Sequence, residues 1–217
     1  MKTLIEIRNM SIGYGQNTLY SGINLDIREG DCIMLCGANG SGKTTLMKAL
    51  SKANGVVMIP TRIPKVKGFT LREFVRVSCY SQSDIGGKLT ASQEAGLEAA
   101  IHILGLTHIA DRDISTLSDG EFQKAGIAAA IARKADVIIL DEPTAFLDAE
   151  NRISVLKTLK TICSQGKAVM FSTHDLHDGL SVADKVIALG ADGKVHTGTE
   201  GLSKIVSTIF LHTPEHI

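Results

Sequence analysis

Short apolar runs alternate along the chain with segments whose apolar residues are spaced as on a helix. Residues 32–36 (CIMLC), 137–140 (VIIL) and 168–171 (AVMF) are uninterrupted apolar runs, typical of parallel strands buried on both faces of a sheet. Between the last two runs, an apolar stripe recurs every three positions and predicts a helix closed by Gly166. The stripe consists of Ile153, Leu156, Leu159 and Ile162. The alternation predicts an α/β fold with a mostly parallel sheet.

The two ends of the chain carry weaker signals. Apolar residues at positions 4, 5, 7, 10 and 12 partly alternate with polar ones and predict an opening strand. Residues 186–189 and 194–196 flank the Asp192-Gly193 turn, a pattern typical of a β-hairpin. Residues 201–217 carry no motif that predicts an element.

The middle of the chain is helical in its apolar spacing, from about residue 69 to residue 106. Thr70 with Glu73, and Thr90 with Gln93, have the spacing of capping boxes, in which a hydroxyl and a Glu or Gln side chain bond the first free amides of a helix. We therefore expect one domain over residues 1–217, with a helical subdomain at about residues 62–133 inserted into the α/β core.

The composition limits the functions open to this chain. Lys plus Arg equals Asp plus Glu, so the formal net charge is zero and nucleic acid is not an expected partner. No apolar run approaches the ~20 residues of a membrane span, and the N-terminus lacks the apolar block of a signal peptide. We expect a cytosolic chain whose membrane role, if any, comes through a partner. The four cysteines are expected to be buried and unpaired.

A glycine-rich loop follows the first apolar run and matches the pattern G-x-x-x-x-G-K-[ST]. In such a loop the backbone amides and the helix N-terminus surround phosphate oxygens. Lys43 is expected to reach the β- and γ-phosphates, Thr44 to ligate Mg²⁺, and Thr45 to add a phosphate contact. The nucleotide-binding residues are Gly37, Ala38, Asn39, Gly40, Ser41, Gly42, Lys43, Thr44 and Thr45.

Two acids follow the second buried run, at the edge of a parallel sheet where ligands collect. Asp141 is expected to hold Mg²⁺ directly or through water. Glu142 is expected to polarise the attacking water, because a carboxylate neutralised by the metal would be a poor base.

These motifs, with three others, resemble in their order the ATP-binding subunits of ABC transporters. Residues 117–121 (LSDGE) resemble the family signature, residues 146–148 its D-loop, and residues 172–175 (STHD) its switch region. Tyr14 resembles the aromatic residue that stacks on adenine. The resemblance implies signature contacts in trans from Ser118, Asp119, Gly120 and Glu121, a D-loop Asp148, and a catalytic His174 beside Glu142 and Lys43.

The resemblance also implies a fold, a reaction and partners. The fold is a P-loop NTPase (RecA-like) core with a trimmed N-terminal antiparallel β part and the helical subdomain. The reaction is Mg²⁺-dependent ATP hydrolysis at two sites shared between the subunits of a homodimer. The dimer would act on integral membrane permease subunits from the cytoplasmic face of the membrane.

Three features depart from the family pattern. Asp119 and Glu121 stand where glycine and glutamine are usual. Thr61 occupies the position of the Q-loop glutamine, and Gln82 lies too far along the chain to replace it. The stretch before Pro60 is too short for the additional strands that the family usually has there.

Residues 68–75 and 110–112 resemble the ATPases of importers for iron-siderophore, haem and cobalamin compounds. This resemblance implies that the chain powers uptake of such a compound and that the full transport system includes an extracytoplasmic binding protein. An ABC exporter, a lipoprotein-release ATPase and a non-transport ABC ATPase are the alternatives.

Overall fold

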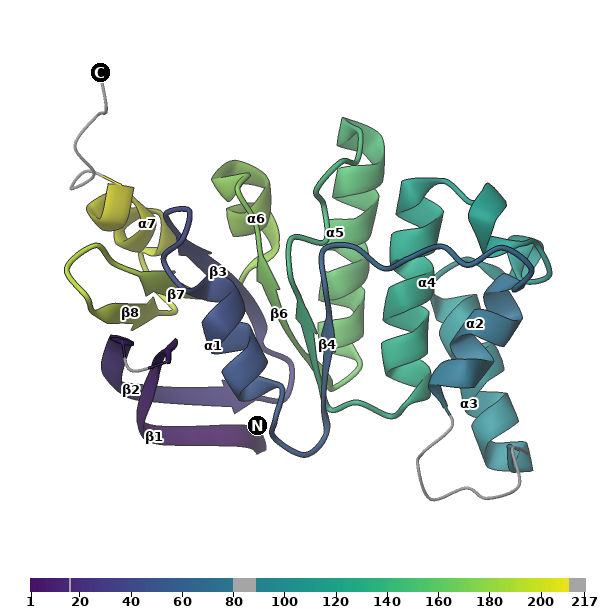
Figure 1. Cartoon of the computed structure of the whole chain (residues 1–217), viewed down its shortest axis with the longest axis horizontal. Helices are drawn as coiled ribbons and strands as arrows, with labels where there is room; N and C mark the ends of the chain where they lie inside the picture. Colours follow the sequence, from purple (N-terminus) through teal and green to yellow (C-terminus); the bar gives the residue numbers. More distant parts are fainter. Residues whose placement is uncertain (16, 80–88, 211–217) are drawn as a thin grey trace.

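The computed structural model describes residues 1–15, 17–79 and 89–210. Its centre is a six-stranded sheet in the order β4-β5-β6-β3-β7-β8, in which every pair is parallel except β7 with β8. Figure 1 shows this sheet running through the middle of the molecule. The strands are β3 (Cys32–Gly37), β4 (Val56–Ile59), β5 (Val137–Leu140), β6 (Ala168–Ser172), β7 (Lys185–Leu189) and β8 (Val195–Gly198).

The sheet is covered on both faces, as its uninterrupted apolar runs predict. Ile33 and Leu35 of β3 pack in one cluster with α1 (Lys43–Leu50) and with β1 and β2. Met34 and Cys36 point the other way, into a cluster that includes α5 (Ala149–Ser164). The short helices α6 (Leu176–Val182) and α7 (Leu202–Phe210) pack beside this second cluster.

A separate two-stranded sheet pairs β1 (Thr3–Tyr14) with β2 (Asn17–Arg28) in antiparallel fashion. The predicted class, a mostly parallel core with an antiparallel N-terminal part, is therefore confirmed. The sequence pattern located only the first of these two strands. β2 buries Ile23, Leu25 and Ile27 on one side, but Gly22 interrupts its alternation and obscured the pattern.

Three helices lie together at one end of the molecule, beyond the β4 edge of the sheet (Figure 1). They are α2 (Leu71–Ser78), α3 (Ala91–Ile103) and α4 (Asp119–Ala132), with short 3-10 turns at Thr107–Ile109 and Ile114–Thr116. Both predicted capping boxes form, at Thr70 and at Thr90. The expected bounds of the helical subdomain, about 62–133, enclose all three helices.

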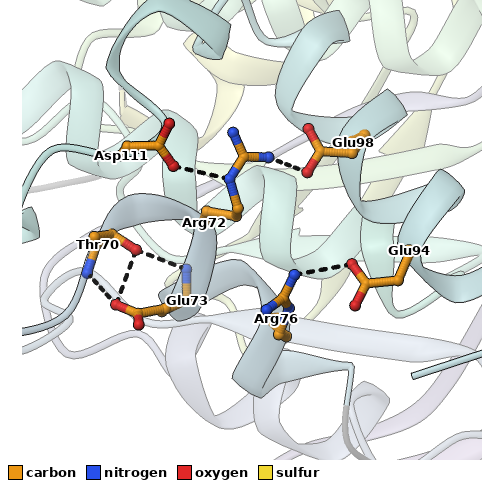
Figure 2. A network of polar contacts seen from close by, with 7 residues as sticks. All are labelled: Thr70, Arg72, Glu73, Arg76, Glu94, Glu98 and Asp111. Atoms are coloured by element: carbon orange, nitrogen blue, oxygen red, sulfur yellow. Dashed lines mark hydrogen bonds and ion pairs between the residues drawn. The ribbon is translucent and has the colours of Figure 1, made fainter. Parts of the chain in front are cut away.

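Ion pairs join these helices at their surface (Figure 2). Arg72 of α2 bonds Glu98 of α3 and, at 2.9 Å, Asp111 in the segment that leads to α4. Arg76, one turn along α2, contacts Glu94 at 3.1 Å. The two arginines thus fix α2 against α3 and against the approach to α4.

Backbone hydrogen bonds also join the segment before α2 to the segment before α4. The amide of Ile114 donates to the carbonyl of Phe69 at 2.9 Å, and the amide of Leu71 donates to the carbonyl of Arg112 at 3.0 Å. The amide of Gly68 donates to the Asp113 carboxylate at 2.8 Å. Residues 68–72 and 110–114 therefore form one connected unit, which we call the paired segments.

Smaller differences from the sequence analysis concern element ends. The helix α1 ends at Leu50, and its last carbonyls are bonded by the amides of Ser51 and Ala53. α7 lies in the C-terminal stretch for which no element was predicted. Gln82 lies outside the described residues. In the described ranges, no helix has the length and apolar character that a membrane crossing needs.

Candidate active site

The glycine-rich loop joins β3 to α1, as its motif requires. Gly42 precedes the helix in the left-handed conformation (φ 98°), which a residue with a side chain adopts at a cost. The amide of Leu46 bonds the carbonyl of Gly42 at 2.9 Å and continues the helix from that point. The first amides of α1 are therefore left to face a ligand.

Lys43 is buried at the centre of this loop, with 8% of its surface exposed. Its ammonium donates to the carbonyls of Gly37 at 2.9 Å and Ala38 at 3.0 Å. Burial lowers the pKa of Lys43, and the nearby carboxylates of Glu142 and Asp141 partly oppose that shift. The ammonium is thus held inside the loop by weak neutral acceptors that an anion could replace.

Asp141 lies between two hydroxyl groups. Thr44 donates to its Oδ2 at 2.9 Å, and Ser172, at the end of β6, donates to its Oδ1 at 2.9 Å. The strand order explains the meeting, because β6 lies between β3 and β5 and all three end at the same edge. Hydroxyl groups of the chain itself therefore orient both carboxylate oxygens.

Glu142 is held by its backbone as well as by its side chain. Its amide donates to the Ser172 hydroxyl at 2.9 Å, and its φ of 52° places a non-glycine residue in the left-handed region. That conformation costs on the order of 1–3 kcal/mol and persists where neighbours fix it. Its Oε1 lies 2.6 Å from Nε2 of His174. The structure thus brings together Lys43, Thr44, Asp141, Glu142 and His174.

Ser172 is a residue whose own role the sequence analysis did not anticipate. It is fully buried and bonds both acids, as donor to Asp141 and as acceptor from the amide of Glu142. A hydroxyl residue at the end of an otherwise apolar strand is the sequence feature that could have indicated its role.

Tyr14 stands at the end of β1, next to the start of α1. The Thr45 hydroxyl bonds its phenol oxygen, and Tyr14 is 60% exposed. A separate cavity of about 320 Å³ borders the loop. It is lined by Leu19, Tyr20, Ala38, Asn39, Gly40, Ser41, Leu189, Gly190, Ala191 and Gly193. Leu19 and Tyr20 lie in a strand that the sequence pattern did not locate.

The signature residues lie at the start of α4. Ser118 caps the helix, its hydroxyl accepting from the amide of Glu121 while the Glu121 carboxylate accepts from the amide of Ser118 at 2.7 Å. Gly120 packs against α5, and a Cβ there would lie 2.8 Å from the Asn151 side chain. Asp119 pairs with Lys65 at 2.8 Å.

The signature is not part of the cluster around Lys43. α4 lies beyond β4, whereas the loop follows β3, with β5 and β6 between them in the sheet. Among the described residues no hydrogen bond or ion pair joins residues 118–121 to residues 37–45. Within one chain the start of α4 and the glycine-rich loop are therefore separate.

Asp148 is the N-cap of α5, and its carboxylate accepts from the Asn151 amide at 2.8 Å. That hydrogen bond lowers the pKa of Asp148. One turn along α5, Arg152 forms ion pairs with Asp175 and Asp178. Arg152 therefore links the helix that follows the D-loop to the residues that follow His174.

Thr61 lies two residues beyond the end of β4, whose last residue Ile59 pairs with Leu140. It lines a groove of about 380 Å³ together with Lys65, Asp119 and the residues around Phe146. The guanidinium of Arg62 lies 4.7 Å from the centre of the Phe146 ring. This groove connects the Q-loop position with the signature and the D-loop.

The side chains of the cluster fit a magnesium triphosphate. The Thr44 hydroxyl and the Asp141 carboxylate are hard oxygen donors, of the type that Mg²⁺ prefers. The Ser41 hydroxyl is buried and has no hydrogen-bond partner within the part of the chain that the structure describes. A buried donor without a partner is costly and is expected where a ligand completes the site.

Comparison with known proteins places the chain in a family. A family profile described as ABC transporter matches residues 20–145. An ABC transporter ATP-binding protein of Methanocaldococcus jannaschii is 30% identical over 208 residues, which cover 84% of this chain and 72% of the relative. An aliphatic sulfonates import ATP-binding protein of Pseudomonas syringae pv. syringae is 32% identical over 198 residues, 89% of this chain and 72% of the relative. The petrobactin import ATP-binding protein of Bacillus anthracis is 26% identical over 214 residues, 87% of this chain and 78% of the relative.

Solved structures agree with these sequences. An inward-facing transporter described as metal-chelate type has a TM-score of 0.85 at 25% identity, covering 97% of this chain and 90% of the matched chain. A nucleotide-free ATP-binding cassette shares the fold, with a TM-score of 0.80 at 17% identity, covering 99% of this chain and 97% of the other. The chain therefore belongs to the ABC transporter family and is one of its ATP-hydrolysing ATP-binding subunits.

Proposed function

We propose that this chain binds Mg-ATP at the cluster around Lys43 and hydrolyses it to power uptake through a membrane permease. The observation that carries the proposal is the continuous chain of contacts from Thr44 through Asp141 and Ser172 to Glu142 and His174. Ser172 ends β6, and the other four lie on the segments that follow β3, β5 and β6, so three neighbouring strands position the cluster.

Each side chain of the cluster has a proposed task. Lys43 exchanges its bonds to two backbone carbonyls for phosphate oxygens, and Thr44 with Asp141 holds Mg²⁺. When bound, that ion offsets phosphate charge and supports the departure of ADP. Glu142 accepts a hydrogen bond from the attacking water and orients it toward the γ-phosphorus. His174 holds the Glu142 carboxylate and is placed to contact the γ-phosphate. Tyr14, exposed beside the loop, stacks on adenine.

The second half of each site is proposed to come from another copy of the chain. The start of α4 offers the Ser118 hydroxyl, the Gly120 amide and a helix dipole, which together suit a phosphate. Since the Lys43 cluster and the start of α4 are separate within one chain, a head-to-tail homodimer would join them twice. Asp148 and Thr61 would line the same interface.

Import is favoured over the alternatives by the transport roles of the relatives. Petrobactin and aliphatic sulfonates are both taken up with the help of such subunits. The metal-chelate type structure supports uptake of an iron-chelate, haem or cobalamin compound as the first candidate, with an extracytoplasmic binding protein. The chain would then lie at the cytoplasmic face of the membrane, attached through its permease.

An organic sulfonate is the second candidate cargo. The sulfonate relatives are 32% identical to this chain, whereas the petrobactin relative is 26% identical. Cargo contacts the permease and the binding protein, so neither identity decides between the two.

A transport assay in cells tests the proposal. A strain that lacks this chain is complemented with the native protein or with Glu142→Gln, and uptake of a labelled ferric chelate and of a labelled alkyl sulfonate is measured. We expect ferric-chelate uptake to require the native protein and to be lost with Glu142→Gln. If only sulfonate uptake is lost with Glu142→Gln, the cargo is an organic sulfonate. Unchanged uptake of both, with loss of an efflux activity instead, would contradict import.

A further inference from the structure

Lys65 lies in the segment between Thr61 and α2 and contacts the signature directly. Its ammonium donates to the backbone carbonyl of Leu117 at 2.8 Å and to Oδ1 of Asp119 at 2.8 Å. The Lys65 side chain is 27% exposed, whereas that of Asp119 is 67% exposed. The lysine is therefore the better fixed member of the pair.

The position of Lys65 is set from several directions. The paired segments begin three residues later, where Gly68 bonds Asp113 at 2.8 Å. The ammonium lies 5.5 Å from the centre of the Phe122 ring, which in turn packs 5.3 Å from Phe74. Contacts within one chain therefore hold the cation at the start of α4.

Asp119 is the residue that makes a cation necessary there. It is the first residue of α4, where a carboxylate interacts favourably with the helix dipole but repels an incoming anion. The other acid of the signature, Glu121, is engaged in the capping box and lies 3.9 Å from Arg112. Asp119 has Lys65 as its ion-pair partner among the described residues.

We propose that Lys65 is a positioning residue for ATP-driven pairing. Its ammonium offsets the charge of Asp119, so that the Ser118 hydroxyl and the Gly120 amide can donate hydrogen bonds to the phosphate of ATP bound by a second copy. The proposal rests on the shared site proposed above. The pairing of Lys65 with Asp119 explains how a signature that contains an acid can bind a phosphate. The Lys65 side chain also links the Thr61 segment to the signature.

The test measures ATP-dependent dimer formation in a Glu142→Gln background, by light scattering during Mg-ATP titration. Four further changes are compared: Lys65→Met, Lys65→Arg, Asp119→Gly, and Lys65→Met with Asp119→Gly. Lys67→Met, an exposed lysine two residues away, is the matched control. Binding of a fluorescent ATP analogue to the monomer reports the Lys43 cluster separately, and thermal unfolding confirms that each variant is folded.

Lys65→Met is expected to raise the half-saturating Mg-ATP concentration for dimerisation about tenfold, as expected for one uncompensated charge near a helix end. Monomer binding of the analogue should not change. Lys65→Arg and Lys67→Met should behave as the parent. The double variant, Lys65→Met with Asp119→Gly, should return the half-saturating Mg-ATP concentration to within about twofold of the parent value. Added salt should reduce the defect of Lys65→Met, because exposed charges are screened.

Two results would overturn the inference while leaving the shared site intact. The first is a Lys65→Met variant that pairs as the parent does. The second is a double variant as defective as Lys65→Met, since Lys65 would then act only through the Leu117 carbonyl. A Glu142→Gln parent that binds ATP but never pairs would instead refute the shared site, and the inference with it.

Discussion

The Ser172 hydroxyl donates a hydrogen bond of 2.9 Å to the carboxylate of Asp141, joining the ends of two neighbouring strands. The same oxygen accepts the amide of Glu142. One buried side chain thus orients the proposed metal ligand and fixes the backbone of the proposed catalytic base.

Ser172→Ala should therefore weaken both stability and catalysis. It leaves a carboxylate oxygen and a backbone amide without their partner, at a cost of about 1–3 kcal/mol. Loss of support for a metal ligand should lower ATPase kcat about tenfold or more and raise the Mg²⁺ requirement. Thermal unfolding and Mg²⁺-dependent phosphate release measure the two effects. Ser164→Ala, at an exposed position of α5, is the control. An unchanged Mg²⁺ requirement would show that Ser172 has no role at the metal site.

Lys43→Ala should strongly weaken nucleotide binding without unfolding the chain. The buried ammonium is the cation of the loop, and hydrogen bonds to a charged group are worth about 1.5–3 kcal/mol each, so affinity should fall roughly 10–100-fold or more. Equilibrium binding of a fluorescent ATP analogue is the measurement. Lys48→Ala, an exposed lysine on the same helix, should bind normally. Full hydrolysis by Lys43→Ala would count against the assignment of this loop.

Thr61→Gln should be tolerated or activating. Thr61 lines the groove that also contains Asp119 of the signature. Glutamine would place a side-chain oxygen in the same groove on a longer side chain. Thr61→Val, which keeps the shape and removes the hydroxyl, should lower ATPase activity. Steady-state phosphate release compares the two. A large loss with glutamine would show that the threonine has a role of its own.

The cysteines should be inert in the folded protein. All four are unpaired and buried, and burial raises the pKa of Cys36 to about 11. A raised thiol pKa leaves less reactive thiolate at neutral pH, so Cys36 should react with an aromatic disulfide reagent roughly a hundredfold more slowly than a free thiol. Reaction of all the cysteines should follow within minutes in denaturant. Rapid labelling of the native protein would contradict the buried positions.

The local features of this fold could be predicted from the sequence. The loop around Lys43 and the helix starts at Thr70 and Thr90 follow from residues within a few positions of one another. The buried strands follow from uninterrupted apolar runs. The chemical roles assigned to the individual site residues, including Lys43, Asp141 and Glu142, remain predictions.

The remainder depends on distant residues meeting in space. The pair of Lys65 with Asp119 joins residues 54 positions apart, and the bond from Ser172 to Asp141 joins residues 31 positions apart. Both arise from strand order and from the paired segments, which no local pattern encodes. Asp119 therefore stood as an unexplained departure in the sequence, while the structure supplies its counter-charge.

The central claim is that ATP joins two copies of this chain, each completing the other's site. Glu142→Gln should bind Mg-ATP and hydrolyse it at a small fraction of the native rate, because the water is no longer polarised. Size-exclusion chromatography with light scattering should then give the mass of two chains with Mg-ATP and of one chain without it. A variant that holds ATP and still elutes as a single chain at every concentration would contradict the account.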